Sequence, residues 1–212
     1  MTYICRPNSN LLFFKMKSKT QWDDKTEQSL REAVETMRRG GIILYPTDTV
    51  WGIGCDATNK EAVEKIYKLK RRSDSKSMLI LTDSEAKLPG LVSELPEIAY
   101  DLIDVSVRPL TVIYSGARNI APNLIAEDGS VGIRISREAW SKELCKRMNV
   151  PVVSTSANIS GEPTPHFFDQ ISDAIKKGVD YIADYRRDDR TPANPSEIIK
   201  LGPKGEVTII RK

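Results

Sequence analysis

The segment from residue 45 to residue 54 reads Tyr-Pro-Thr-Asp-Thr-Val-Trp-Gly-Ile-Gly. It follows an apolar run at residues 42–45, stops at a proline, and continues with hydroxyls, a carboxylate and glycines. Because loops at strand ends are where α/β proteins bind their ligands, this segment predicts a binding loop. Its hydroxyls suit a small polar substrate, and its glycines let backbone approach that substrate closely. An ordinary turn, anchored in the core by Trp51, fits the segment equally well when it is considered alone.

A helical pattern precedes this segment. The apolar side chains recur with the spacing of one helical face: Leu30, Ala33, Val34 and Met37. We expect the helix to begin near Asp24 and to end at Gly40, where a glycine tolerates the left-handed conformation of a helix end. After the segment, Thr58-x-x-Glu61 predicts a capping box that opens a second helix.

The rest of the chain alternates in the same way between helical and extended patterns. Further helices are expected near residues 95–104, 137–148 and 168–177, and strands near residues 78–81, 110–114, 130–135, 151–155, 180–183, 196–200 and 206–211. Interleaved helices and strands predict an α/β fold with a twisted, mostly mixed β-sheet flanked by helices. The short turn at residues 202–205 predicts a hairpin between the last two strands. We expect one domain over residues 23–212, preceded by an extension, residues 1–22, that forms a mobile or edge segment.

Composition narrows the class of protein. The chain has 212 residues, 40% of them hydrophobic and 29% charged, with a net charge of +3. Its apolar runs are too short to cross a bilayer, and its N-terminus lacks a secretory signal pattern. Three widely spaced cysteines are typical of a reducing compartment, so we expect a cytoplasmic protein. The single histidine, His166, excludes a metal site made of several histidines, and it is expected in a surface loop.

A cluster of cations lies at residues 60–76, with seven basic residues against three acidic ones. Cations at a helix C-terminus offset its dipole, which is the plain structural interpretation. However, this cluster continues beyond the predicted helix into the following loop. Lysine and arginine in such a loop suit the oxygens of a polyphosphate, with an RNA backbone as the chief competitor.

Three strand ends add further polar groups. The strand at residues 130–134 ends in Arg134, which suits a bidentate grip on a carboxylate, or else a surface salt bridge. Residues 152–161 run from apolar side chains into hydroxyls that suit phosphate or carboxylate, or merely cap a turn. Residues 194–199 place Ser196 after a proline, where a simple turn is the alternative.

Taken together, these segments resemble the threonylcarbamoyl-AMP synthase family, also called the YrdC-like domain. The matching segments are residues 45–54, 70–76, 109–113, 131–134, 154–161 and 194–198, in the family's order and approximate spacing over residues 25–212. The resemblance implies a YrdC-like sheet with a concave basic face, in a short single-domain form. It also implies the conversion of L-threonine, bicarbonate and ATP into threonylcarbamoyl-AMP and pyrophosphate, with Mg²⁺. A separate threonylcarbamoyl-transferase complex would then modify tRNA next to the anticodon.

The resemblance also implies roles for individual residues. Threonine or its carbamate would be held by Thr49, Arg134, Ser154 and Ser196. ATP would be held by Arg72, Lys76, Ser130, Ser156, Thr164 and Arg211. The residues expected to act in catalysis are Lys70, Arg72 and Lys76, with Lys70 as a further phosphate contact. Leu81 stands where some relatives have histidine, which leaves a threonine contact at that position open.

Two alternatives stay open on the sequence alone. One is an RNA-binding protein that uses the same basic surface for tRNA or double-stranded RNA. The other is a family member that keeps the fold without the synthase activity. The segments at residues 70–76 and 156–158 favour an active synthase over this second alternative.

Overall fold

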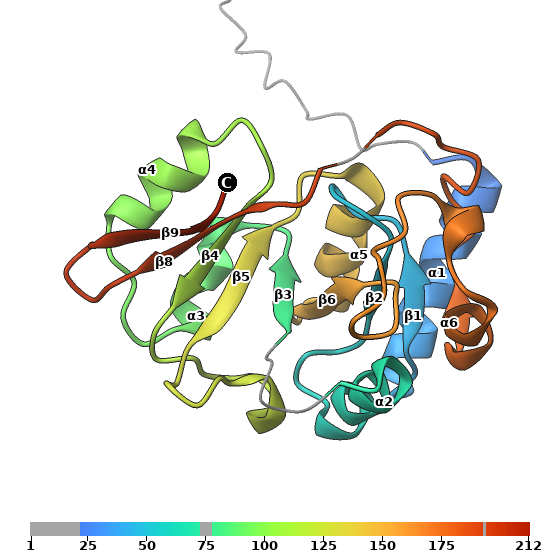
Figure 1. Cartoon of the computed structure of the whole chain (residues 1–212), viewed down its shortest axis with the longest axis horizontal. Coiled ribbons are helices and arrows are strands. Elements are labelled where there is room, and N and C mark those ends of the chain that lie inside the picture. Colours follow the sequence, from blue (N-terminus) through green and yellow to red (C-terminus); the bar gives the residue numbers. More distant parts are fainter. Residues whose placement is uncertain (1–21, 73–77, 193) are drawn as a thin grey trace, which may run out of the picture.

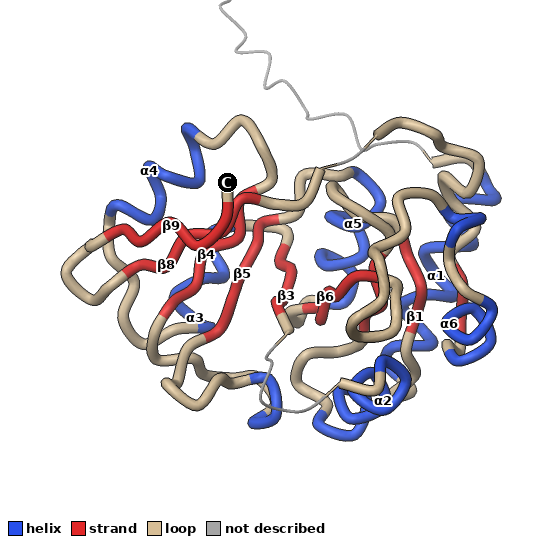
Figure 2. Tube along the Cα trace, viewed as in Figure 1, coloured by secondary structure: helices blue, strands red, loops and turns tan. Residues whose placement is uncertain are grey.

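The computed structural model describes residues 22–72, 78–192 and 194–212 (Figure 1). Its helices are α1 (Asp24–Arg38), α2 (Lys60–Lys70), α3 (Leu88–Leu91), α4 (Ile98–Val105), α5 (Ala139–Met148) and α6 (Asp173–Gly178). Its strands are β1 (Ile43–Tyr45), β2 (Gly52–Gly54), β3 (Leu79–Thr82), β4 (Leu110–Tyr114), β5 (Val131–Ile135), β6 (Val152–Ser156), β7 (Tyr181–Ile182), β8 (Glu197–Leu201) and β9 (Val207–Arg211). In Figure 2 these strands run as a band across the molecule, with helices around it.

The strands of the described residues form one nine-stranded sheet in the order β7-β1-β2-β6-β3-β5-β4-β8-β9. The pairs β1/β7, β3/β5 and β4/β8 are parallel, and the other neighbouring pairs are antiparallel. The predicted mixed sheet is therefore confirmed. The predicted hairpin is also confirmed, because β8 and β9 pair antiparallel across a turn that contains Gly205 at φ 86°.

The two faces of the sheet are covered differently. Side chains such as Val112, Ile133 and Val153 pack with α2, α3 and α4 in one core. On the opposite face, Leu81 and Val152 pack with α1 and α5 in a second core. Alternation along β6 puts Ser154 on the same face as Val152, and the register of β3 with β5 puts Arg134 beside Leu81. The face that α1 and α5 cover therefore also carries polar side chains, Ser154 and Arg134.

Most expected elements are present, and two of the predicted boundaries were wrong. The N-cap of α2 is Asn59, whose side chain accepts a hydrogen bond from Ala62 N at 2.9 Å. Thr58, the predicted cap, instead donates its hydroxyl to Asp56 Oδ1 at 2.7 Å. The helix expected at residues 168–177 is broken into a 3₁₀ turn, Phe168–Gln170, and α6.

The strand β2 lies inside the segment that was expected to be only a loop. Its glycines explain why the sequence pattern hid it, since they carry no apolar side chain to alternate. A Cβ at Gly54 would meet Val153 O at 2.5 Å and the Tyr45 ring at 2.7 Å. Glycine therefore lets β2 fit between β1 and β6.

The predicted extension, residues 1–22, lies outside the described residues apart from Trp22. The Trp22 ring packs edge-on against Tyr185, with 5.9 Å between the ring centroids. Within the described ranges, none of the helices is long and apolar enough to cross a membrane.

Candidate functional site

A cavity of about 380 Å³ opens on the polar part of the second face. Its walls come from the β1–β2 loop, from the ends or edges of β2 to β6, and from β8 and β9. Among the residues predicted from the sequence, those that line it are Thr49, Arg72, Ser130, Arg134, Ser154, Ser156, Thr164, Ser196 and Arg211. Residues far apart in the chain are therefore gathered around one space. Of the other two predicted residues, Lys70 lies elsewhere and Lys76 is outside the described residues.

The β1–β2 loop forms one wall and is held by its own hydroxyls. Thr47 Oγ1 donates to Val50 O at 2.7 Å and accepts a hydrogen bond from Thr49 N at 3.1 Å. The hydroxyls of Thr47 and Thr49 also lie 3.0 Å apart. Sequence reasoning did not single out Thr47, although two threonines spaced two residues apart are a signal for such a turn. The network presents the Thr49 side chain to the cavity in a defined position.

Gly52 keeps part of the cavity open. A Cβ at this position would lie 3.3 Å from Ser154 Oγ and 3.3 Å from Thr47 Cγ2, both belonging to cavity residues. The glycine in the first half of β2 thus leaves space beside Ser154. It also lets backbone approach a ligand, as the sequence pattern predicted for this segment.

Arg134 is a buried cation on β5. Its Nη2 lies 3.0 Å from Asp48 Oδ1, and the two side chains are only 4% and 8% exposed. The approach is an ion pair that is not aligned as a hydrogen bond. Among the described residues, neither Asp48 oxygen nor Arg134 Nε has a hydrogen-bond partner. Sequence reasoning chose Arg134 and missed Asp48, because the pairing joins segments 86 residues apart (134 − 48).

A second polar network links β4, β8 and β9. Arg211 donates from Nε to Ser196 O at 2.9 Å and from Nη2 to Ser196 Oγ at 3.2 Å. Ser196 Oγ lies 2.9 Å from Thr111 Oγ1. The pKa of Arg211 is lowered by burial and, secondly, by the nearby Arg134 cation. Two guanidinium groups thus act on the same region, which favours an anionic ligand there. Thr111 was quoted within a matching segment but was not proposed as a site residue.

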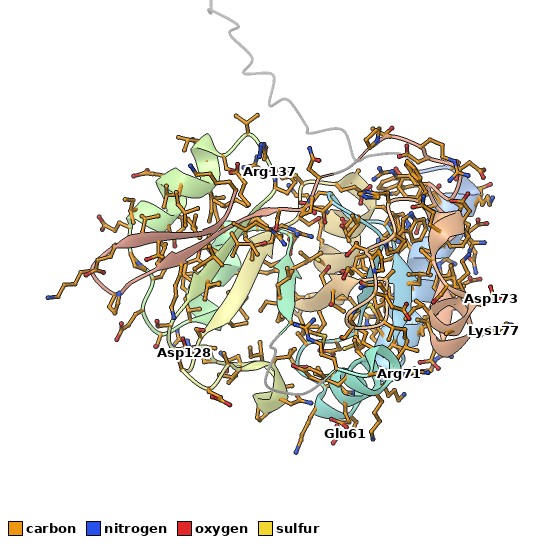
Figure 3. All side chains as sticks on the ribbon, in the orientation of Figure 1. Glu61, Arg71, Asp128, Arg137, Asp173 and Lys177 are labelled. Carbon is orange, nitrogen blue, oxygen red and sulfur yellow. The ribbon has the colours of Figure 1, made fainter. Side chains whose placement is uncertain are left out.

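Ser130 is fixed by a carboxylate at the cavity edge. Its Oγ donates to Asp128 Oδ1 at 2.5 Å, and Lys200 Nζ lies 2.6 Å from the other carboxylate oxygen. Hydrogen bonds from Lys200 and then Ser130 lower the pKa of Asp128 to about 2. In Figure 3, Asp128 lies near the start of β5.

The end of β6 and the loop after it also line the cavity, through Ser156 and Thr164. Ser156 Oγ donates to Asn158 Oδ1 at 2.5 Å, while the Asn158 amide donates to Ile159 O at 3.0 Å and to Glu162 O at 2.7 Å. Asn158 therefore ties the loop to itself. This arrangement holds Ser156 in the wall of the cavity, and its contact with ATP stays a prediction.

Lys70 differs from its predicted position. Its ammonium donates to the backbone oxygens of Ser156 and Asn158, and the residue is 2% exposed and absent from the cavity wall. Burial, and secondly the Arg72 cation, lower the pKa of Lys70 to about 8. The last turn of α2 directs this side chain inward, and Arg71, labelled in Figure 3, ends the helix in the left-handed conformation at φ 51°. In this structure Lys70 links α2 to the loop after β6, and its expected contact with phosphate stays a prediction.

Within the basic segment at residues 60–76, Arg72 is the described residue that lines the cavity. Burial lowers the pKa of its guanidinium. Leu81, whose contact with threonine was left open, is fully buried against α1 and α5 and does not line the cavity. Leu79, two residues earlier on the same face of β3, lines it instead.

Among the described residues, the guanidinium groups and hydroxyls of the cavity suit the binding and orientation of anions. Cys55 and Cys145 are buried away from it, and burial raises the pKa of both thiols. Across the described ranges, no group of three histidine, cysteine, aspartate or glutamate residues is placed to hold a metal ion. Hydroxyls and guanidinium groups instead suit catalysis by positioning and electrostatic stabilisation.

Fold and cavity together define an α/β protein with a site for anionic, hydrogen-bonding small molecules. A model of the Sua5/YciO/YrdC family, described as "Telomere recombination", matches residues 35–212. The chain therefore belongs to this family, and the resemblance found in its sequence is confirmed.

Individual relatives agree with this assignment. Threonylcarbamoyl-AMP synthase of Stenotrophomonas maltophilia (strain K279a) is 34% identical over 166 residues, covering 74% of this chain and 87% of the relative. The crystal structure of P. abyssi Sua5 complexed with L-threonine matches with a TM-score of 0.77 and 25% identity, over 87% of this chain and 54% of that one. This chain thus spans about half the length of that Sua5. The crystal structure of E. coli YciO, with a TM-score of 0.75 and 23% identity over 88% of this chain and 89% of that one, supports the fold.

Proposed function

We propose that this chain is an L-threonylcarbamoyladenylate synthase. The observation that carries the proposal is the meeting of Arg72, Arg134 and Arg211 with the hydroxyls of several strand ends in one cavity. Guanidinium groups suit both the carboxylate of an amino acid and the phosphates of a nucleotide. The relatives named threonylcarbamoyl-AMP synthase support this function, and they give no support to the RNA-binding alternative.

The reaction would proceed in two steps. The neutral amine of L-threonine attacks bicarbonate, forming the N–C bond of a carbamate and releasing water. A carbamate oxygen then attacks the α-phosphorus of ATP, the bond to the bridging oxygen breaks, and pyrophosphate leaves. Both steps need well-placed reactants and offset of negative charge, and neither needs a covalent enzyme intermediate.

The cavity residues divide between the two substrates. Thr49, Arg134, Ser154 and Ser196, all in the wall of the cavity, would hold threonine or its carbamate. Arg72, Ser130, Ser156, Thr164 and Arg211 would hold ATP, together with Lys76 of the undescribed segment. Arg72 and Lys76 would stabilise charge on the phosphates, while Lys70 would act by holding the loop of Ser156.

Mg²⁺ is proposed as the companion of ATP. The described wall of the cavity offers hydroxyl oxygens and no carboxylate, so such an ion would be held mainly by the phosphates of ATP and by water. Such an ion would offset phosphate charge. We further propose a cytoplasmic location and transfer of the product by a separate complex to tRNA next to the anticodon.

One assay tests the function directly. Pyrophosphate release from ATP is measured with each of the twenty amino acids, with and without bicarbonate. Release that requires L-threonine and bicarbonate together is expected. Release that is independent of either one would reject the synthase, and salt-sensitive RNA binding without threonine-dependent turnover would favour the RNA-binding alternative.

A further inference from the structure

Asp48 is a buried carboxylate whose oxygens make no hydrogen bond within its own loop. The turn around it is held by Thr47 Oγ1, which bonds Val50 O and Thr49 N. Neither oxygen of Asp48 accepts a hydrogen bond from a described residue, although its side chain is only 8% exposed. A buried carboxylate without hydrogen bonds costs free energy, so Asp48 does not stabilise the turn by capping it.

The charged group that faces Asp48 most closely is Arg134, at 3.0 Å. Two other arginines line the adjoining cavity of about 290 Å³ on the outer side of this loop, and both are engaged elsewhere. Arg186 pairs with Asp189 at 2.7 Å, and Arg108 pairs with Glu197 at 3.2 Å. Among these arginines, Arg134 is therefore the one that forms an ion pair with Asp48.

Asp48 contacts Arg134 without lining the main cavity itself. Asp48 lines the outer cavity and is absent from the wall of the main cavity, whereas Arg134 lines the main cavity. The carboxylate thus touches the guanidinium without forming part of the wall of the main cavity. Asp48 offsets the positive charge of Arg134. Arg134 in turn lies close enough to Arg211 to lower the pKa of Arg211.

We propose that Asp48 is a positioning residue that holds the Arg134 guanidinium for the carboxylate of the amino-acid substrate. This inference rests on the proposed synthase function. Without Asp48, Arg134 would lose its anchor, and repulsion from Arg211 would move it away from its present place. The loss is expected in binding of the amino acid and not in binding of ATP.

The test uses Asp48→Asn, which keeps the shape and removes the charge, Arg134→Gln, and the double variant. Pyrophosphate release is measured against threonine at saturating ATP and bicarbonate, and against ATP at saturating threonine. Asp48→Asn is expected to raise the KM for threonine by about tenfold or more, and to change the KM for ATP by less than about twofold. The double variant should be no worse than Arg134→Gln alone, because the two residues act as a unit.

Asp184→Asn is the matched control. It removes a carboxylate that pairs with Lys25 at 3.0 Å and with Arg187 at 3.5 Å outside both cavities, and should leave both KM values unchanged. An unchanged threonine KM in Asp48→Asn, or additive effects in the double variant, would overturn the inference. Inactive wild-type protein would instead reject the proposed function.

Folding supplies an independent readout. If Asp48→Asn unfolds because it leaves the Arg134 charge uncompensated, the double variant should regain stability in denaturant titrations. A double variant no more stable than Asp48→Asn would mean that Asp48 serves the loop and not Arg134.

Discussion

The ammonium of Lys70, at the end of α2, donates a hydrogen bond of 2.6 Å to the backbone oxygen of Asn158, in the loop after β6. The same ammonium also reaches Ser156 O, and Ser160 N donates to Lys70 O at 2.9 Å. Lys70 thus joins the basic segment to the loop that carries Ser156. Two parts of the proposed ATP site are positioned by one buried cation.

Replacing Lys70 with methionine should weaken this link. Two carbonyl groups would lose their donor while the chain length stays similar, so the free energy of unfolding should fall by about 1–3 kcal/mol. The KM for ATP should rise more than the KM for threonine. Denaturant titration and steady-state kinetics check both effects, and unchanged stability with unchanged ATP affinity would contradict the link.

Lys70 also predicts a pH dependence of stability. Burial lowers its pKa from 10.5 to about 8, so between these values the unfolded chain binds a proton that the folded chain does not. Stability should therefore rise as pH increases from about 8 towards 10.5, relative to Lys70→Met. Parallel stability curves for the two proteins over this range would contradict the expectation.

Arg72→Ala should cripple turnover while the fold persists. Arg72 lines the cavity, and the loss of a cation that stabilises phosphate charge costs on the order of 100-fold in kcat. Lys76→Ala should act similarly. The matched control is Arg71→Ala, because Arg71 is exposed and does not line the cavity. Wild-type rates in both the Arg72 and Lys76 variants would refute the assignment of the phosphate site.

Two glycines of β2 should respond differently to alanine. In Gly52→Ala, the new methyl group would lie 3.3 Å from Ser154 Oγ and from Thr47 Cγ2, side chains that can yield, so binding should weaken with little loss of stability. In Gly54→Ala, it would lie 2.5 Å from the backbone oxygen of Val153, so stability should fall by about 1–3 kcal/mol. Thermal melts and threonine kinetics separate the two, and equal loss of stability would contradict the distinction.

The thiols of Cys55 and Cys145 should resist alkylation in the folded protein. Both are buried, and burial raises the pKa of each, so little reactive thiolate forms at neutral pH. Iodoacetamide labelling followed by peptide mass spectrometry should detect these positions only after unfolding. Rapid labelling of either thiol in native protein would show that the buried cores open.

The sequence by itself determined the α/β class, the mixed sheet and the family. Local periodicity located α1, and short polar segments at strand ends named many of the residues that line the cavity. These features are local, since side-chain pattern and turn chemistry act over a few neighbouring residues. The N-cap of α2, Asn59, and the glycine-rich strand β2 were missed because several local structures are compatible with the same short sequences.

Tertiary structure alone decided which side chains face each other across the sheet. Asp48 meets Arg134, and Ser196 meets Thr111, because strand order and register place distant segments side by side. The same is true of Lys70, whose charge suggested a phosphate contact but whose position at the last turn of α2 directs it beneath the loop of Asn158. Charge can be read from a residue's identity, whereas its burial and its partner depend on how the whole chain packs.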